Sequence, residues 1–350
     1  MNIYILSDEF PWFGSHTGYS QLPRYLREAD PDILIIQPRP GPLDRWIGKA
    51  YSLLHGWWSR HDSVRAAAEF RFSGLLAGCA AQGDMCHILY FDLHHYFWER
   101  WRKAPRNVMA TIHHPPPRRI PDRMLRNLSR LSSAIILCQA DLSFYESCIG
   151  RDRVRFIHHG VDIAFFHPAA QNNLSSRRIL FAGHNGRNTQ MLHRVIARLT
   201  HRQPTLQFDL LVPRQYRYFS GLEQLTSHGN VRWHERLSDE ALRELYQTSY
   251  LLLLPMESCS ANNAIVESLA CGLPIVTTDI GGIRDYGGAS VYPLVSNNDD
   301  DSMIALLERY LGDPGWRNEV ARNCRQFAEQ NLSWPLIAKQ HLEAYQAFLS

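Results

Sequence analysis

Short apolar runs alternate with helix-like segments along this chain, and that alternation restricts the possible folds more than any other feature. The pattern is clearest where Leu251–Leu254 is followed by a polar loop, a helical segment Ala264–Cys271, a Gly-Leu-Pro break and the apolar run Ile275–Thr278. A short, wholly apolar run of this kind predicts a strand that is buried on both faces. The order strand, loop, helix, turn and strand therefore indicates one crossover unit of a parallel sheet.

The same alternation predicts an α/β protein with two Rossmann-like, doubly wound domains. In the first half we expect strands at Ile3–Ser7, Ile33–Gln37, Ile88–Phe91, Met109–Ile112, Ile135–Cys138 and Arg155–Ile157. In the second half we expect strands at Arg178–Ala182, Gln207–Val212, Val231–Trp233, Tyr250–Pro255, Ile275–Thr278 and Ser290–Tyr292. The polar stretch Ala169–Arg178 has the composition of a linker. Two such domains face each other across a cleft, which is a preferred place for a ligand.

Charge and cysteine usage exclude several classes of function. The net charge of +3 is too small to argue for a nucleic-acid partner. The chain has no GxxxxGK[ST] phosphate loop and no GxGxxG after either expected first strand, which disfavours a P-loop enzyme and a pyridine-nucleotide dehydrogenase. The seven cysteines form no CxxC pair, so we expect no metal site and a reducing, cytoplasmic compartment. No uninterrupted apolar run is long enough for a membrane span.

The segment from Trp46 to Phe72 is rich in Trp, Leu, Arg and Ala. One interpretation is an ordinary helical pair with aromatic core contacts. The other is a surface that lies peripherally on the inner face of a membrane or grips an amphipathic acceptor. The sequence leaves both interpretations open.

Several motifs, taken in order, resemble the retaining GT-B glycosyltransferases of family four. The motifs are "HHGVDIAFFHP" (His158–Pro168), "RILFAGHNGRN" (Arg178–Asn188), "NVRWHERLSDEALRELYQTSYLLLLP" (Asn230–Pro255), "SANNAIVESLACGLPIVTTDIGG" (Ser260–Gly282) and the final "NLSWPLIAKQHLEAYQAFL". The resemblance is specific over residues 155–350. Over residues 1–154 it is thinner and rests on "DEFPWFGSHTGYS" (Asp8–Ser20) and "TIHHPP" (Thr111–Pro116).

This resemblance implies an organisation and an activity. Residues 1–165 are expected to bind the acceptor, residues 166–333 to bind a nucleotide-sugar donor, and residues 334–350 to form a helix that crosses back to the first domain. The implied activity is metal-independent hexosyl transfer with retention and without a cofactor. The donor would carry UDP, GDP, ADP or dTDP, and the acceptor would be a carbohydrate, a lipid-linked glycan or a small molecule.

The donor-binding residues follow from the motifs that match. A departing diphosphate needs fixed cations and amide donors, and Arg187 in a Gly-containing turn is placed to supply a bidentate cation. The family's second cation falls nearest to His184. Asn262 and Asn263 precede a helix whose first amides suit an anion, and the resemblance implies that Glu267 accepts from both ribose hydroxyls. The base is expected near Leu237.

One departure from the family pattern concerns the donor sugar. The family carries a second Glu eight positions before Glu267, where this chain has Cys259. Glu257 substitutes for that Glu if the loop rearranges, and otherwise the sugar contact is lost. No feature near Cys259 except a helix start lowers its pKa, which disfavours this thiol as a nucleophile.

Three further residues are expected to contribute from the first domain. Gly14 and Gly18 bracket the turn after the first strand, where glycines permit close approach to a phosphate or sugar. His113 follows the strand Met109–Ile112 and corresponds to a family histidine near the sugar, although His114 competes for that role.

Two other functions stay open at this point. A sugar-nucleotide epimerase or hydrolase of the same fold would need acid-base groups, for which His113 and His158–His159 are the visible candidates. A non-catalytic nucleotide-sugar-binding relic would be consistent with Cys259 at the position of the family's Glu.

Overall fold

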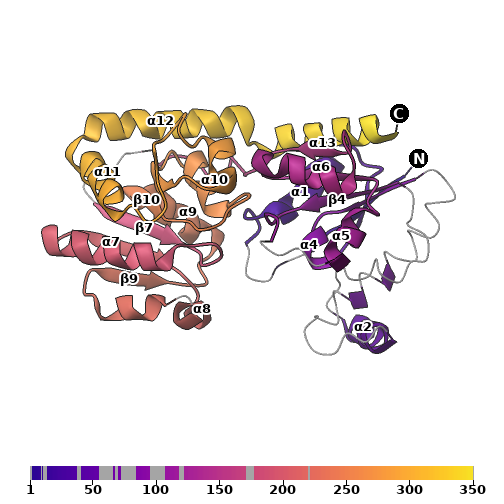
Figure 1. The fold of residues 1–350 in the computed structure, drawn as a ribbon, viewed down its shortest axis with the longest axis horizontal. Helices are drawn as coiled ribbons and strands as arrows, with labels where there is room; N and C mark the ends of the chain where they lie inside the picture. The colour runs from indigo at the N-terminus through magenta and orange to yellow at the C-terminus, as the bar shows by residue number, and fades with distance from the viewer. Residues whose placement is uncertain are drawn as a thin grey trace. The chain divides into compact units, whose positions relative to one another are not determined.

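A computed structural model describes residues 2–8, 10, 14–37, 41–54, 66–67, 70–71, 84–94, 107–117, 122–170, 177–219 and 221–349 (Figure 1). The chain divides into two compact units. Unit 1 consists of Met1–Pro11, Tyr19–Ile157 and Pro335–Ser350, and unit 2 consists of Trp12–Gly18 and His158–Trp334. Each unit is described by itself below.

Unit 1 is built on a parallel sheet of six strands within the described residues. The strands are β1 (Ile3–Leu6), β2 (Leu34–Ile36), β3 (Met85–Ile88), β4 (Val108–Ile112), β5 (Ser133–Ile136) and β6 (Val154–Phe156), in the order β2-β1-β3-β4-β5-β6. The helices are α1 (Leu22–Ala29), α2 (Pro42–Leu54), α4 (Phe91–His94), α5 (Asp122–Leu128), α6 (Leu142–Ile149) and all but the first residue of α13 (Trp334–Leu349). Strands β3, β4 and β5 are buried along their whole length, which explains why they are mostly apolar; His87, Thr111 and Ser133 are their polar residues.

Helix α13 is fixed to unit 1 by buried polar pairs as well as by apolar packing. His341 Nδ1 donates to the carbonyl of Ile337 at 2.8 Å, so its Nε2 accepts from the Tyr19 hydroxyl, also at 2.8 Å. Tyr345 lies 2.6 Å from Nδ1 of His87, whose Nε2 lies 2.9 Å from the Thr111 hydroxyl. Each of these imidazoles is therefore satisfied while neutral and buried.

Unit 2 repeats the plan with a different strand order. Its described strands are β7 (Arg178–Ala182), β8 (Gln207–Leu211), β9 (Val231–His234), β10 (Leu251–Leu254), β11 (Ile275–Thr278) and β12 (Leu294–Val295). They form one parallel sheet in the order β12-β11-β10-β7-β8-β9. Counted from its first strand, this is the 3-2-1-4-5-6 order of a doubly wound sheet, with its topological switch point between β7 and β10.

The helices of unit 2 cover both faces of this sheet. They are α7 (Thr189–Arg202), α8 (Arg214–Phe219), α9 (Asp239–Thr248), α10 (Asn263–Ala270), α11 (Asp300–Gly312) and α12 (Pro314–Asn331). Helix α7 packs against α11, and α10 packs against α12. The crossovers before and after the switch point run in opposite directions, so right-handedness places α7 and α10 on opposite faces. The predicted fold class, two doubly wound α/β units, is confirmed.

Two expected strands were wrong. The run Ile88–Phe91 was expected as a strand, but β3 ends at Ile88 and Phe91 begins helix α4. Residues Ser290–Tyr292 form part of a turn, and the edge strand β12 begins two residues later at Leu294. Gly287 has a φ of +88°, and its carbonyl accepts from the Val291 amide at 2.8 Å, which closes the turn. Tyr292 is buried, so its apolar signal comes from packing in the core rather than from a ladder.

Candidate active site

The loops that follow β7 and β10 meet at the switch point of unit 2. Parallel strands have their carboxyl ends at one edge of the sheet, and ligands of such sheets bind outside that edge. Arg187, after β7, forms an isolated antiparallel bridge with Met256, after β10. The Met256 amide in turn donates to the Thr278 hydroxyl at 2.9 Å. The ends of β7, β10 and β11 are thus joined.

Arg187 turns its guanidinium back over the end of β7. Its Nε and Nη2 donate to the carbonyl of Ala182 at 3.0 and 2.8 Å, and its Nη1 donates to the carbonyl of Asn185 at 2.7 Å. Nη2 also lies 3.3 Å from Oδ1 of Asn262. None of the ion pairs among the described residues involves Arg187. Within that part of the chain, this half-buried cation therefore has only neutral hydrogen-bond partners. Burial lowers its pKa to about 10, and it stays charged at neutral pH.

Two glycines make this loop possible. Gly183 and Gly186 have φ values of +81° and +67°, which other residues rarely adopt. A Cβ on Gly183 would lie 2.7 Å from Arg187 Nη2, and one on Gly186 would lie 2.3 Å from the carbonyl oxygen of Ser258. The Gly186 carbonyl accepts from the amides of Glu257 and Ser258 at 2.8 and 3.3 Å. The two loops therefore touch backbone to backbone.

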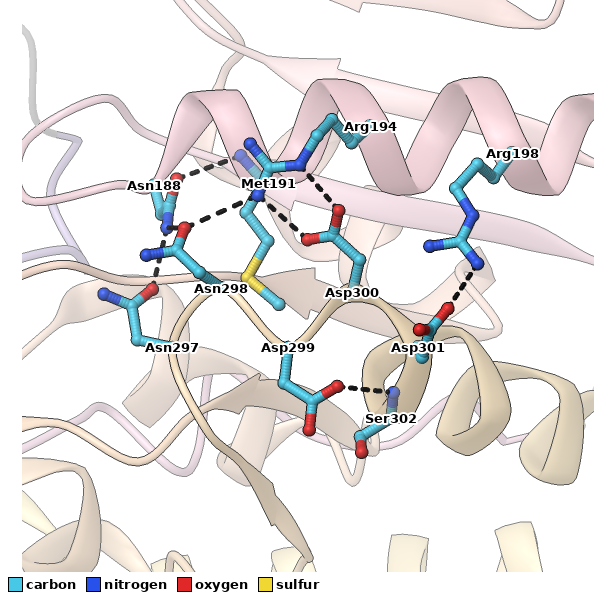
Figure 2. A network of polar contacts seen from close by, with 10 residues as sticks. All are labelled: Asn188, Met191, Arg194, Arg198, Asn297, Asn298, Asp299, Asp300, Asp301 and Ser302. Carbon is cyan, nitrogen blue, oxygen red and sulfur yellow. Dashed lines mark hydrogen bonds and ion pairs between the residues drawn. The ribbon is translucent and has the colours of Figure 1, made fainter.

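Helix α7 begins two residues after Arg187, and a polar network holds its start in place (Figure 2). Asn188 is buried and caps the helix, accepting from the Met191 amide at 2.9 Å. Its Nδ2 donates to the side-chain oxygens of Asn297 and Asn298 at 2.7 and 2.8 Å. On the next turn Arg194 pairs with Asp300 at 2.6 and 3.0 Å. These contacts join the start of α7 to the loop before α11 and to the first residue of α11, and so they fix the direction of α7.

Asn262 caps helix α10, and Asn263 is its first residue. The Asn262 side chain accepts from the Ala264 amide at 3.0 Å. The same side chain accepts from the Arg187 guanidinium, so a single residue links the start of α10 to this cation. A helix start with an adjacent cation is suited to an anion.

Glu267 lies one turn further along α10 and is almost completely buried. Its Oε2 accepts from the Tyr246 hydroxyl at 2.8 Å, while its Oε1 has no hydrogen-bond partner among the described residues. Burial raises the pKa of Glu267 to about 8, and the neighbouring Tyr246 and Thr17 hydroxyls offset part of that rise. A buried carboxyl group whose second oxygen has no hydrogen-bond partner is unusual unless a ligand donates to that oxygen.

The turn after β1 belongs to unit 2 and packs beside Glu267. Gly14 lies so close to Asp239 that a Cβ would meet its carboxylate at 1.5 Å, and the Ser15 amide donates to the same carboxylate at 2.7 Å. His16 Nδ1 lies 2.7 Å from an oxygen of Asp162. Gly18 ends the turn with a φ of +89°. Both predicted glycines thus occupy positions that other residues would strain.

A hollow of about 760 Å³ opens beside Arg187. The residues that line it include His184, Arg187, Gln190, Tyr216, Gln224 and Glu257. His184 stacks on Tyr216 with ring centroids 3.7 Å apart, and burial together with Arg187 lowers the pKa of His184. His184 is therefore neutral at neutral pH in this state, and it adds no second fixed cation. Glu257, the alternative to the missing Glu, lines the same hollow.

Cys259 is buried under the neighbouring loop. Its carbonyl accepts from the Gly282 amide at 2.9 Å, and burial raises the pKa of its thiol to about 12. The thiol is protonated at neutral pH, which agrees with the view that it is no nucleophile. Leu237, after β9, packs against the core beside Arg236, which has a φ of +52°. No metal-binding group of three or more His, Cys, Asp or Glu side chains occurs among the described residues.

His113 belongs to unit 1. Its amide donates to Asp92 at 2.7 Å, and its Nε2 donates to the Leu89 carbonyl at 2.7 Å, which leaves Nδ1 as an acceptor. The ring stacks on Tyr90 at 4.6 Å, and burial lowers its pKa. His113 is held as a neutral imidazole in a single orientation.

The structure thus gathers the predicted donor residues at one end of unit 2 and places His113 in unit 1. Sequence reasoning missed Tyr246 and Thr17, which lie beside Glu267, and Asp239, which holds the turn after β1. All three lie inside motifs that resemble the family, but no local sequence signal assigns them these contacts. Tyr246 occupies a buried helix position whose sequence pattern is typical of a hydrophobic core residue.

Part of this chain is similar in sequence to known proteins. A family model described as "Glycosyl transferases group 1" matches residues 176–313. A D-inositol 3-phosphate glycosyltransferase of Nocardiopsis dassonvillei is 26% identical over 56% of this chain and 50% of its own length. One of Salinispora tropica is 28% identical over 55% of this chain and 46% of its own length. The chain spans about half the length of these relatives.

Solved structures match nearly the whole chain. Sucrose-phosphate synthase from Thermosynechococcus elongatus superposes with a TM-score of 0.74 at 17% identity, covering 99% of this chain and 98% of that one. HepE of Anabaena, solved with UDP-glucose, superposes with a TM-score of 0.72 at 15% identity, covering 99% and 100%.

The two doubly wound units and these structural neighbours define a protein of the GT-B fold. Residues 176–313, which lie within the second unit, also match the model of the group 1 glycosyl transferases.

Proposed function

We propose that this protein transfers a sugar from a nucleoside-diphosphate sugar to an acceptor hydroxyl, with retention and without a metal. The proposal rests above all on Arg187, a half-buried guanidinium that has only neutral partners among the described residues and lies at the switch point of unit 2. Asn262, which caps α10, contacts it, and Glu267 follows one turn along that helix. All three lie inside the stretch that matches the family model.

Each of these groups has a role toward a nucleotide. Arg187 and the first amides of α10 would hold the diphosphate, because cations and helix starts stabilise anions. The open oxygen of Glu267 would accept from the ribose diol once the carboxyl group is ionised. His184 and Glu257, in the adjoining hollow, would face the sugar end of the donor.

In the proposed reaction the bond from the sugar C1 to the diphosphate oxygen breaks, and a bond from C1 to the acceptor oxygen forms on the same face. The departing phosphate oxygen takes the proton of the acceptor hydroxyl. The products are a glycoside and a nucleoside diphosphate. Arg187 stabilises the negative charge that builds on the leaving group, which is where a preorganised cation contributes most. This route needs no protein nucleophile, consistent with the buried, protonated thiol of Cys259.

A nucleotide panel followed by a transfer assay tests the proposal. UDP, GDP, ADP and dTDP should differ in how far they raise the melting temperature, and the best of them names the donor class. UDP-glucose is the first donor to try because HepE was solved with it. Inositol 3-phosphate is one acceptor to include, since the named relatives act on it.

A sugar-acceptor product of retained anomeric configuration by NMR supports the proposal. Free sugar without acceptor product would favour the hydrolase instead. Binding of no nucleotide in the panel would overturn the proposal at its first step.

A further inference from the structure

Helix α2 of unit 1 has one face that is anchored and one that is not. On the inner face Asp44 pairs with Arg71 at 2.5 Å, and Arg71 also donates to the Gln37 carbonyl at 3.3 Å. Tyr51 is buried on the same face and packs against Phe70, with ring centroids 5.6 Å apart. These contacts fix the rotation of the helix about its own axis.

The opposite face presents an apolar stripe to solvent. Leu43, Trp46 and Leu53 are 72%, 73% and 62% exposed, and Ala50 between them is exposed as well. Successive helical residues are about 100° apart, so positions 43, 46, 50 and 53 fall on one side of the helix. Of the eight large hydrophobic side chains that are exposed among the described residues, three lie on this stripe. Such a concentration is typical of a binding surface rather than of scattered surface residues.

Two cations run along one edge of the stripe. Arg45 and Lys49 are exposed and are four residues apart, which places them on the same side of α2. Asp44 is the sole acidic residue of α2, and it is on the inner face, where Arg71 neutralises it. The outer face therefore carries Trp and Leu beside positive charge that no ion pair among the described residues neutralises.

We propose that α2 is a membrane-docking helix that lies in the surface of a bilayer containing anionic phospholipid. The stripe of Leu43, Trp46, Ala50 and Leu53 enters the boundary between headgroups and acyl chains. Arg45 and Lys49 reach the lipid phosphates along its edge. Helices that lie in the interface have this pattern of Trp and Leu on one side and Lys or Arg beside them. No helix in the described part of the chain is long and apolar enough to cross a bilayer. The docking surface is independent of the proposed transfer, because lipid binding needs no donor or turnover.

Flotation of the full chain with vesicles tests the surface directly. We expect the protein to float with vesicles of phosphatidylcholine and phosphatidylglycerol in equal parts, and not with phosphatidylcholine alone. Raised salt should weaken binding, because the charge contribution is screened. Lys49→Glu should lower partitioning by roughly fivefold or more, since each basic residue near the surface contributes appreciably. Trp46→Glu and the neutral pair Leu43→Ser with Trp46→Ser should reduce flotation to the background level.

A matched control is available on another helix. Tyr218 of α8, in unit 2, is 75% exposed, as open as Trp46, so Tyr218→Glu should leave flotation unchanged. Circular dichroism and the melting temperature should show that all variants fold. Equal flotation of native protein and Trp46→Glu, or equal loss in Tyr218→Glu, would refute the proposal. So would self-association that Trp46→Glu abolishes while no vesicle binds, because the stripe would then cover a second copy.

Discussion

Tyr246 donates a 2.8 Å hydrogen bond to one oxygen of Glu267, whereas the other oxygen of that carboxyl group has no partner among the described residues. Burial raises the pKa of Glu267 to about 8, so the ligand-free group is protonated at neutral pH. A ribose diol that donates both hydroxyls favours the ionised form. Nucleotide binding through this group must therefore be linked to release of a proton.

We predict that UDP binding near neutral pH releases up to one proton from Glu267. Affinity should rise as the pH increases toward about 8 and level off above it, because the free carboxyl is then already ionised. Calorimetry in buffers of different ionisation enthalpy measures the proton directly. Glu267→Gln cannot ionise, so this variant should lose that part of the pH dependence and bind roughly ten- to a hundredfold more weakly. Identical pH profiles for the two proteins would exclude the role.

Tyr246→Phe removes the hydroxyl group that donates to Glu267. The Tyr246 hydroxyl lowers the pKa of Glu267, so its removal should move the pH at which UDP affinity levels off further upward. The variant should also lose about 1–3 kcal/mol of stability, because a buried polar group loses its partner. A pH titration of UDP affinity shows the first effect and urea unfolding shows the second. A change in stability with an unaltered pH profile of UDP affinity would mean that Tyr246 does not influence nucleotide binding.

The fold and the order of the candidate site residues were predictable because they depend on local patterns. Strand β10 is buried along its whole length, and its wholly apolar run indicates this. Arg187 and Asn262 follow strands that are adjacent across the switch point, so strand order alone brings them together.

The partners of these residues were not predictable in the same way. Tyr246 reaches Glu267 from α9, and Asp239 accepts from the Ser15 amide across more than two hundred positions of sequence. Such pairings depend on how helices lie on the sheet, which single-residue propensity does not encode. Burial of Glu267 is the strongest example, because a lone Glu one turn into a helix usually reads as a surface residue.

Arg187→Ala should lower turnover with UDP-glucose more than it lowers affinity for UDP. In the proposed reaction the guanidinium would stabilise charge that grows as the donor bond breaks, so its contribution would be largest in the transition state. We expect roughly a ten- to hundredfold loss in kcat, the effect of one charged hydrogen-bond donor. Arg198→Ala on the following helix α7, where Arg198 pairs with Asp301, is the matched control and should retain native kinetics. An equal fall in kcat and in UDP affinity would make Arg187 a docking contact only.

Gly186→Ala should destabilise the protein more than Gly221→Ala does. Both glycines have φ near +70°, so each substitution incurs about 1–2 kcal/mol of backbone strain. A Cβ on Gly221 meets nothing within 4 Å, whereas one on Gly186 would lie 2.3 Å from the backbone of Ser258. The difference in unfolding free energy between the variants therefore isolates the contact between the two loops. Equal destabilisation would mean that the loops are free to separate.

The buried imidazole of His341 makes unit 1 sensitive to acid. Burial lowers the pKa of His341 from 6.5 to about 4, so between these values the unfolded chain binds more protons than the folded one. Stability is therefore complete above pH 6.5 and declines as the pH falls toward 4, by up to about 3 kcal/mol. His87 adds a change of the same sign, because burial also lowers its pKa. Melting temperatures across this range should fall less steeply for His341→Gln, whereas His201→Gln on the exposed end of α7 should follow the native protein. A native slope in His341→Gln would contradict the assignment.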